Sequence, residues 1–203
     1  MIGIVAYGAG NVGNLTRAFH RLGQDVRLME HPEEAPQATL LVLPGVGAFP
    51  PAVRQLEKSG WAETLQDAAH RGQPLLGICL GMQLLAEESR EDGTTPGLGL
   101  IRGTVMPLEG LPRIPHMGWN SLHWSPGDPW APSSPAWCYF VHGFALWESP
   151  DAVATCEVAG RRFVAAVRRG SVAGCQFHPE RSGPEGVAFL GHLSSLLIAG
   201  ACS

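Results

Sequence analysis

The chain has 203 residues, a hydrophobic fraction of 45% and a formal net charge of −4. This length is enough for one domain with a sizeable core, and the composition is that of a globular protein. The charges are scattered, which argues against a nucleic-acid-binding surface, because such surfaces cluster Lys and Arg. The densest basic group, which is more typical of a solvated hairpin than of a binding patch, consists of Arg161, Arg162, Arg168 and Arg169.

The cysteines argue against both a disulfide framework and a structural zinc site. Their number is odd and no two have Cys-x-x-Cys spacing. Residues 1–5 contain neither a basic segment nor a secretory cleavage site, and no apolar run reaches transmembrane length. We therefore expect a cytoplasmic protein that binds neither membranes nor nucleic acids. The five cysteines are Cys79, Cys138, Cys156, Cys175 and Cys202.

The first half of the chain alternates short apolar runs with segments of helical periodicity. Runs bounded by Gly and Pro predict strands, and the periodic segments between them predict helices. This alternation predicts βαβ units and a parallel sheet covered on both faces. The predicted strands are 2–7, 25–30, 39–43 and 74–78, and the predicted helices are 11–22, 53–71 and 80–89.

The second half of the chain changes character. Residues 107–136 are rich in Pro, Gly and Trp and predict a long structured excursion, and Gly160 and Gly170 mark tight turns further on. We expect a single α/β domain over residues 1–203, with a mostly parallel central sheet flanked by helices and an antiparallel portion in the C-terminal half. The later strands are predicted at 137–142, 152–158, 162–167 and 171–177, and the last helix at 184–199.

A glycine-rich turn follows the first predicted strand. It reads Gly8-Ala9-Gly10-Asn11-Val12-Gly13, and Glu30 ends the next strand. This combination is the dinucleotide-binding fingerprint and, alone, would indicate a nicotinamide-dependent oxidoreductase. However, a strand-to-helix turn needs glycine for steric reasons without any cofactor. A dehydrogenase of this length would also have little chain left for a substrate domain, so the oxidoreductase is a distant alternative.

A second strand-to-helix turn has the pattern of a nucleophile elbow. It reads Gly77-Ile78-Cys79-Leu80-Gly81, and Gly-x-Cys-x-Gly is the cysteine version of that motif. The glycines allow the neighbouring backbone to come close, and the start of the following helix favours a thiolate. The N–H of Leu80 would point to a developing oxyanion. The alternative, a small buried apolar cysteine, fits Cys79 less well than the cysteines inside strands.

A candidate base and its orienting carboxylate stand two residues apart. His178 and Glu180 flank Pro179, which favours extended backbone at the histidine. Residues i and i+2 of an extended segment face the same side, so the carboxylate would hold the imidazole, as acyl transfer from a cysteine requires. Metal binding by His116, His123 and His142 is a weaker alternative, because their spacing matches no common ligand pattern, and no metal site is expected.

Two motifs together resemble the class I glutamine amidotransferases. They are residues 77–83 and 176–180, about a hundred residues apart in the expected order. The resemblance implies hydrolysis of L-glutamine to glutamate and ammonia through a thioester on Cys79, with His178 and Glu180 completing the triad. Further segments resemble the glutaminase subunit of imidazole glycerol phosphate synthase, most discriminatingly Pro-His-Met-Gly-Trp-Asn. These segments are 7–11, 44–49, 97–100, 115–120 and 139–142.

The resemblance also implies roles for other positions. The oxyanion strand would be 45–47, with N–H groups from Val46, Gly47 and Leu80 around the oxyanion. Glutamine would contact Gly45, Gly47, Gln83 and His142. The partner would contact Asn11, Asn14, Met117 and Trp119. The alternative for Trp119 is a structural role as a buried core residue. Two positions depart from the family pattern: Ala6 stands where Asp is usual, and Gly143 where Ser is common.

The implied partner is the cyclase subunit of imidazole glycerol phosphate synthase, a (β/α)8 barrel that would form a heterodimer with this chain and use its ammonia in histidine biosynthesis. No cofactor is expected, and without a phosphate loop no ATP use is expected. The nearest alternative is a class I glutaminase that serves another pathway. A catalytically dead regulatory subunit is disfavoured because all three triad residues are present.

Overall fold

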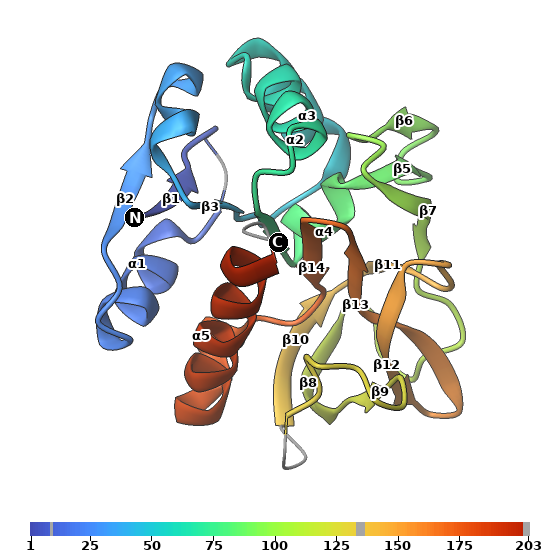
Figure 1. Ribbon diagram of the computed structural model, residues 1–203. Coiled ribbons are helices and arrows are strands. Elements are labelled where there is room, and N and C mark those ends of the chain that lie inside the picture. Colours follow the sequence, from blue (N-terminus) through green and yellow to red (C-terminus); the bar gives the residue numbers. More distant parts are fainter. Residues whose placement is uncertain (9, 133–136, 201–203) are drawn as a thin grey trace.

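The computed structural model describes residues 1–8, 10–132 and 137–200, so that Ala9 and Cys202 lie outside the described residues. Its main element is an eight-stranded sheet with the order β2-β1-β3-β4-β14-β13-β12-β9 (Figure 1). The predicted fold class, a mostly parallel sheet with an antiparallel portion, is confirmed. The sheet places β4 beside β14, and the segments that follow these two strands carry the candidate catalytic residues.

The parallel part of the sheet contains the four strands predicted in the first half. They are β1 (Ile2–Val5), β2 (Val26–Met29), β3 (Leu40–Leu43) and β4 (Leu75–Ile78). All pairings among them are parallel, with Ile2 opposite Val26 and Leu40, and Leu41 opposite Leu75. Strands β1, β3 and β4 are buried along their whole length, because helices cover both faces of the sheet.

Helices α1 (Val12–Arg21) and α5 (Gly183–Gly200) pack on one face of the sheet, and α2 (Phe49–Lys58) and α3 (Trp61–His70) pack on the other (Figure 1). The core therefore has two layers. One contains Phe19 and Leu190 from the first helix pair, and the other contains Leu56 and Trp61 from the second. The short helix α4 (Leu80–Leu84) and two 3-10 helices, η1 (Pro32–Gln37) and η2 (Pro179–Arg181), complete the helical elements of the described chain.

Two helix predictions were wrong in extent. The single helix predicted at 53–71 is two helices, because Gly60 has φ +78° and breaks the periodic segment between α2 and α3. The helix predicted at 80–89 ends at Leu84. Its second half is strand β5 (Ala86–Ser89), which pairs with β7 (Ile101–Pro107) and β6 (Thr95–Pro96) in a separate sheet that also contains β11 (Phe144–Leu146).

The main sheet continues through β14 (Val172–Cys175), which pairs parallel with β4 and antiparallel with β13 (Arg161–Arg169). The antiparallel part then continues through β12 (Ala152–Val158) and β9 (His123–Trp124). The turn glycines Gly160 and Gly170 both have positive φ, as the tight turns required. The predicted excursion contains β8 (His116–Ser121), which pairs antiparallel with β10 (Trp137–His142) as a two-stranded ribbon. Residues 133–136 of that excursion are outside the described residues.

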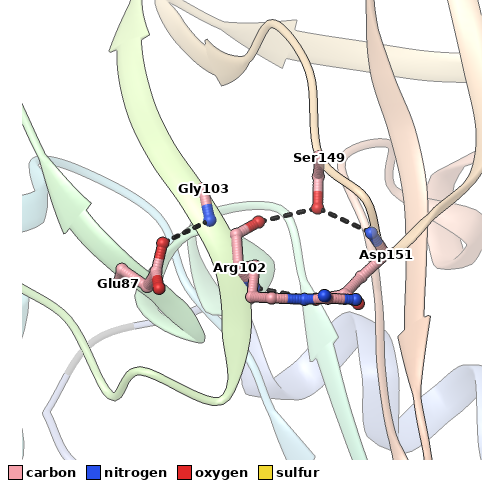
Figure 2. Close-up of polar contacts among 5 residues, drawn as sticks. All are labelled: Glu87, Arg102, Gly103, Ser149 and Asp151. Atoms are coloured by element: carbon pink, nitrogen blue, oxygen red, sulfur yellow. Dashed lines mark hydrogen bonds and ion pairs between the residues drawn. The ribbon is translucent and has the colours of Figure 1, made fainter.

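A polar network ties the second sheet to the turn before β12 (Figure 2). The buried carboxylate of Asp151 accepts from the backbone N–H of Arg102 at 2.8 Å and from its guanidinium Nε at 3.1 Å. Ser149 donates to the carbonyl of Arg102 at 2.7 Å, and Glu87 accepts from the N–H of Gly103 at 2.8 Å. These bonds fix the β7 edge against the main sheet. Among the described residues, no helix is long and apolar enough to cross a membrane.

Candidate active site

Cys79 occupies a strained turn between β4 and the short helix α4 (Leu80–Leu84). Its φ is +55° and its ψ −112°, a conformation that a non-glycine residue adopts only when its surroundings impose it. Its backbone N–H donates to the carbonyl of Cys175 in the neighbouring β14 at 2.8 Å. The strand pairing therefore imposes the strain and turns the side chain toward the carboxyl edge of the sheet.

The flanking glycines are required by close backbone contacts. A Cβ on Gly81 would lie 1.9 Å from the carbonyl oxygen of Leu43, and a Cβ on Gly77 would lie 2.6 Å from the carbonyl oxygen of Gly81. Neither position therefore has room for a side chain. Because α4 spans only five residues, its dipole is weaker than the predicted longer helix would supply.

His178 and Glu180 form a buried ion pair after the end of β14. The Nδ1 of His178 lies 2.8 Å from Oε1 of Glu180, and the exposed fractions of the two side chains are 5% and 2%. The other carboxylate oxygen of Glu180 has no hydrogen-bond partner among the described residues. The backbone N–H of His178 donates to the carbonyl of Tyr139 at 2.9 Å, so β10 also holds the histidine in place.

The surroundings of His178 favour its charged form. Burial alone would lower the pKa of this imidazole, but hydrogen bonds to Cys79 and Glu180 raise it to about 10. The imidazole is therefore protonated at neutral pH and lies beside the sulfur. The site therefore places a cationic imidazole, which is held by a carboxylate, beside the sulfur of Cys79.

A cavity of about 190 Å³ opens beside the nucleophile. It brings together residues that are far apart in the chain, and it includes most of the positions predicted to bind glutamine or the oxyanion. Glu91 also lines it and was missed by the sequence analysis; its Oε2 accepts from the backbone N–H of Phe49 at 2.7 Å. The lining residues are Val46, Gly47, Cys79, Leu80, Gln83, Glu91, Val141, His142, Gly143, Phe144 and His178.

The predicted oxyanion strand, residues 45–47, packs on the elbow. A Cβ on Gly45 would lie 2.5 Å from the backbone nitrogen of Gly81, so only glycine fits there. Gly47 has φ +98° with open space around it, and the side chain of Val46 is 46% exposed. The first residue of this segment is thus fixed by packing, while the next two face the cavity.

Gln83 and His142 have their polar groups arranged by the backbone of Phe144. The carbonyl oxygen of Phe144 accepts from Nε2 of Gln83 at 2.8 Å and from Nδ1 of His142 at 2.9 Å. The Nε2 of His142 is buried and has no partner among the described residues. Burial lowers the pKa of His142 to about 3, so this nitrogen is a neutral, buried acceptor on a residue that lines the cavity.

The four predicted interface residues lie on the surface, but in two groups. Met117 and Trp119 are 58% and 49% exposed on β8, so Trp119 is not a core residue. Trp137 of β10 pairs with Ser121 of β8, extends the same face and is 55% exposed. It had not been assigned from the sequence. Asn11 caps α1 by accepting from the N–H of Asn14, which gives it a structural role as well.

The remaining polar candidates have structural explanations. Cys138, Cys156 and Cys175 are buried in strands, and burial raises the pKa of Cys138 and of Cys156 to about 12. His116 contacts Asn120 at 3.0 Å and packs edge-on against His142. His123 lies in β9, within the predicted excursion. On the hairpin strand β13, Arg161, Arg162 and Arg169 are exposed, as expected of a solvated hairpin, whereas Arg168 is partly buried and pairs with Asp128 at 2.9 Å.

Comparisons with known proteins agree with this geometry. The family model for glutamine amidotransferase class-I matches residues 4–192. The chain is 46% identical over 190 residues to the imidazole glycerol phosphate synthase subunit HisH of Exiguobacterium sibiricum, covering 94% of this chain and 92% of that protein. It is 44% identical over 197 residues to the HisH subunit of a Synechococcus species, covering 93% and 90%.

Solved structures share the fold at lower sequence identity. A glutamine amidotransferase crystal structure matches with a TM-score of 0.76 and 19% identity, covering 100% of this chain and 99% of that one. The structure of PurLQS from Thermotoga maritima matches with a TM-score of 0.73 and 21% identity, covering 100% and 98%. From the family model and the HisH relatives together, the chain belongs to the class I glutamine amidotransferases and, within them, to the family of HisH subunits of imidazole glycerol phosphate synthase.

Proposed function

We propose that the chain is the glutaminase subunit of an imidazole glycerol phosphate synthase, and that Cys79, His178 and Glu180 are its catalytic triad. The observation that carries the proposal is the buried His178–Glu180 pair beside a strained cysteine in one cavity. Family membership contradicts the oxidoreductase alternative. The fingerprint glycines have another explanation, since Gly8 and Gly10 have positive φ and a Cβ on Gly10 would lie 2.9 Å from the ring of Pro44.

The reaction follows from the charges in the site. The Cys79 thiolate attacks the side-chain carboxamide carbon of glutamine, and the carbonyl oxygen becomes an oxyanion that the N–H groups of Leu80 and the 45–47 segment stabilise. The His178 imidazolium gives its proton to the leaving nitrogen, and ammonia departs from a γ-glutamyl thioester. Neutral His178 then takes a proton from water, which attacks the thioester and releases glutamate.

The cavity also explains how glutamine is oriented. Its α-ammonium group needs an acceptor, and Glu91 and Gln83, whose side chains both carry oxygen acceptors, line the same cavity. The unpartnered Nε2 of His142 is a further buried acceptor. A substrate donor that reached this nitrogen would satisfy it. We therefore assign Gln83, Glu91 and His142 to substrate recognition, together with the backbone of Gly45 and Gly47.

The decisive experiment measures glutamate release from glutamine by the purified chain, with and without a cyclase subunit and its nucleotide ligand. We expect weak turnover alone and strong stimulation by the liganded partner. Cys79→Ala should abolish turnover, whereas Cys156→Ala, the same change at a buried cysteine outside the site, should retain it. If the partner did not change the rate of turnover, the chain would be a glutaminase of another pathway. If Cys79→Ala retained turnover, the assignment of the triad would be wrong.

The exposed face of the β8–β10 ribbon supports a partner at this position. Trp119 and Trp137 are large apolar side chains that are 49% and 55% exposed, and such residues are typical interface anchors. We expect Trp119→Ala to weaken association with the cyclase subunit by about 1–3 kcal/mol. Leu28→Ala is a matched control, since Leu28 is 41% exposed on the distant edge strand β2. Equal affinities of both variants in calorimetry would place the interface elsewhere.

A further inference from the structure

A fully buried glutamine lies directly behind the nucleophile. Gln176 follows β14, and none of its surface is exposed. Its side-chain Nε2 lies 3.7 Å from the sulfur of Cys79, and its backbone N–H donates to the carbonyl of Ala165 at 2.9 Å. Gln176 and His178 are two residues apart, and both side chains reach the sulfur from the segment that follows β14.

The orientation of this amide follows from a chain of hydrogen bonds. The carbonyl oxygen of Phe144 can only accept, so the group of Gln83 that faces it at 2.8 Å is the NH₂. That same NH₂ lies 2.9 Å from the amide of Gln176, which must therefore present its oxygen. The NH₂ of Gln176 is left facing the sulfur of Cys79. Flipping either amide would bring two donors or two acceptors together in the interior.

We propose that Gln176 is a further catalytic residue, whose side-chain N–H donates a hydrogen bond to the Cys79 sulfur and stabilises it as the thiolate. The assignment rests on the proposed function in taking Cys79 as the nucleophile. It gives the sulfur two donors, the cationic His178 and a neutral amide, besides the carbonyl oxygen of Val141, which lies 3.9 Å away and can accept only from the protonated thiol. It also leaves the Gln83 oxygen as that side chain's free group for the substrate, because both hydrogens of its NH₂ are donated.

The test is the pH profile of Cys79 alkylation by iodoacetamide, followed on the Cys79 peptide by mass spectrometry. Gln176→Met keeps the size of the side chain and removes the donor. We expect the midpoint of the profile to rise by about one pH unit, with a similar plateau rate at high pH. The other ionisable groups around the sulfur are His178, Tyr7 and Cys175, with Glu91 and His142 on the cavity wall, and all are unchanged in the variant.

A matched control is available at Gln73. Its Nε2 donates to the carbonyls of Ala35 and Ala38, both at 2.8 Å, and it does not line the cavity. Gln73→Met makes the same chemical change and should leave the midpoint where it is in the wild type. A Gln176→Met variant with the wild-type midpoint would overturn the proposal.

A second measurement uses the intact site, in case Gln176→Met does not fold. In the wild-type chain, the side-chain NH₂ resonances of Gln176 should titrate with the alkylation midpoint, and Cys79→Ala should abolish that titration. If the chemical shifts of these NH₂ resonances did not change as the sulfur ionises, the proposal would be wrong. If the wild type shows these effects but hydrolyses no glutamine with the cyclase subunit, the hydrogen bond stands and the proposed function fails.

Discussion

The hydroxyl of Tyr7 donates to the carbonyl oxygen of Pro44 at 2.9 Å, immediately before the oxyanion strand. Burial, with a smaller effect of nearby Cys79, raises the pKa of Tyr7 well above its ordinary value, so the hydroxyl remains a donor. This bond and the packing of Gly45 on Gly81 fix the beginning of the strand. Any reorientation of an oxyanion peptide is therefore confined to the Val46 and Gly47 side of the segment.

We predict that Tyr7→Phe lowers kcat for glutamine hydrolysis by about tenfold and leaves KM nearly unchanged, because a misplaced oxyanion donor acts on the transition state. The variant also leaves the buried Pro44 carbonyl without its donor, so unfolding in urea should show a loss of about 1–2 kcal/mol. The rate of Cys79 alkylation, which forms no oxyanion, should be preserved. A variant with wild-type kcat would show that the strand is held by packing alone.

Glu180→Gln should reduce turnover and change its pH dependence. The carboxylate is one of the groups that raise the pKa of His178 to about 10, so its neutral isostere should lower that pKa. The alkaline limb of the kcat profile, where the imidazolium is lost, should then move to lower pH, and kcat at neutral pH should fall at least about tenfold. The measurement is kcat from pH 6 to about 10. If the alkaline limb of the kcat profile did not move, the titration of a group other than His178 would be its cause.

The raised pKa of His178 also has a consequence for stability. A group whose folded pKa lies above its ordinary 6.5 contributes fully below that pH and loses its contribution as the pH rises toward about 10. We predict that the free energy of unfolding of the wild type falls relative to His178→Gln between pH 6.5 and 9.0. The window ends below the folded pKa of about 10, above which His178 is neutral in both the folded and the unfolded state and the difference levels off. If the free energies of unfolding of the two proteins changed with pH in parallel, the His178–Glu180 ion pair would be contradicted.

Gly143→Ser should be tolerated and should strengthen glutamine binding. A Cβ at Gly143 would meet only Cγ2 of Ile114, at 3.9 Å, which is ordinary contact. The added hydroxyl would lie at the wall of the cavity and supply one further hydrogen bond. We expect KM to fall by roughly threefold at constant kcat, with unchanged stability. A rise in KM would show that the glycine leaves room that the substrate needs.

Much of the fold followed from local patterns in the sequence. Buried parallel strands are short apolar runs, and β1 to β4 were found within two residues of their bounds. The helix after Cys79 was overextended because Ala86-Glu87-Glu88-Ser89 contains no β-branched or aromatic residue that would predict a strand. The Ala86–Ser89 strand exists only because β7, contributed from further along the chain, pairs with it, and single-segment reasoning does not contain that partner.

The candidate site was predictable where its residues are neighbours in sequence. His178 and Glu180 are separated by one proline, and Cys79 is framed by glycines, so both arrangements leave a local pattern. Glu91 and Gln176 were not assigned because their roles depend on tertiary contacts. Glu91 reaches the cavity from a turn after β5, and Gln176 is oriented by a chain of amides that starts at Phe144. Trp137 was missed because its exposure depends on the register of β10 against β8.

The pairing of β4 with β14 has a consequence for how such a protein can change. The next residue after β4 is Cys79, and its N–H completes the ladder at Cys175. The separation between nucleophile and base is therefore specified by hydrogen-bond register and not by the length of chain between them. Insertions or deletions at the Gly160 or Gly170 turns would leave that separation untouched. These two turns can diverge, or accept engineered segments, without moving the reacting atoms apart.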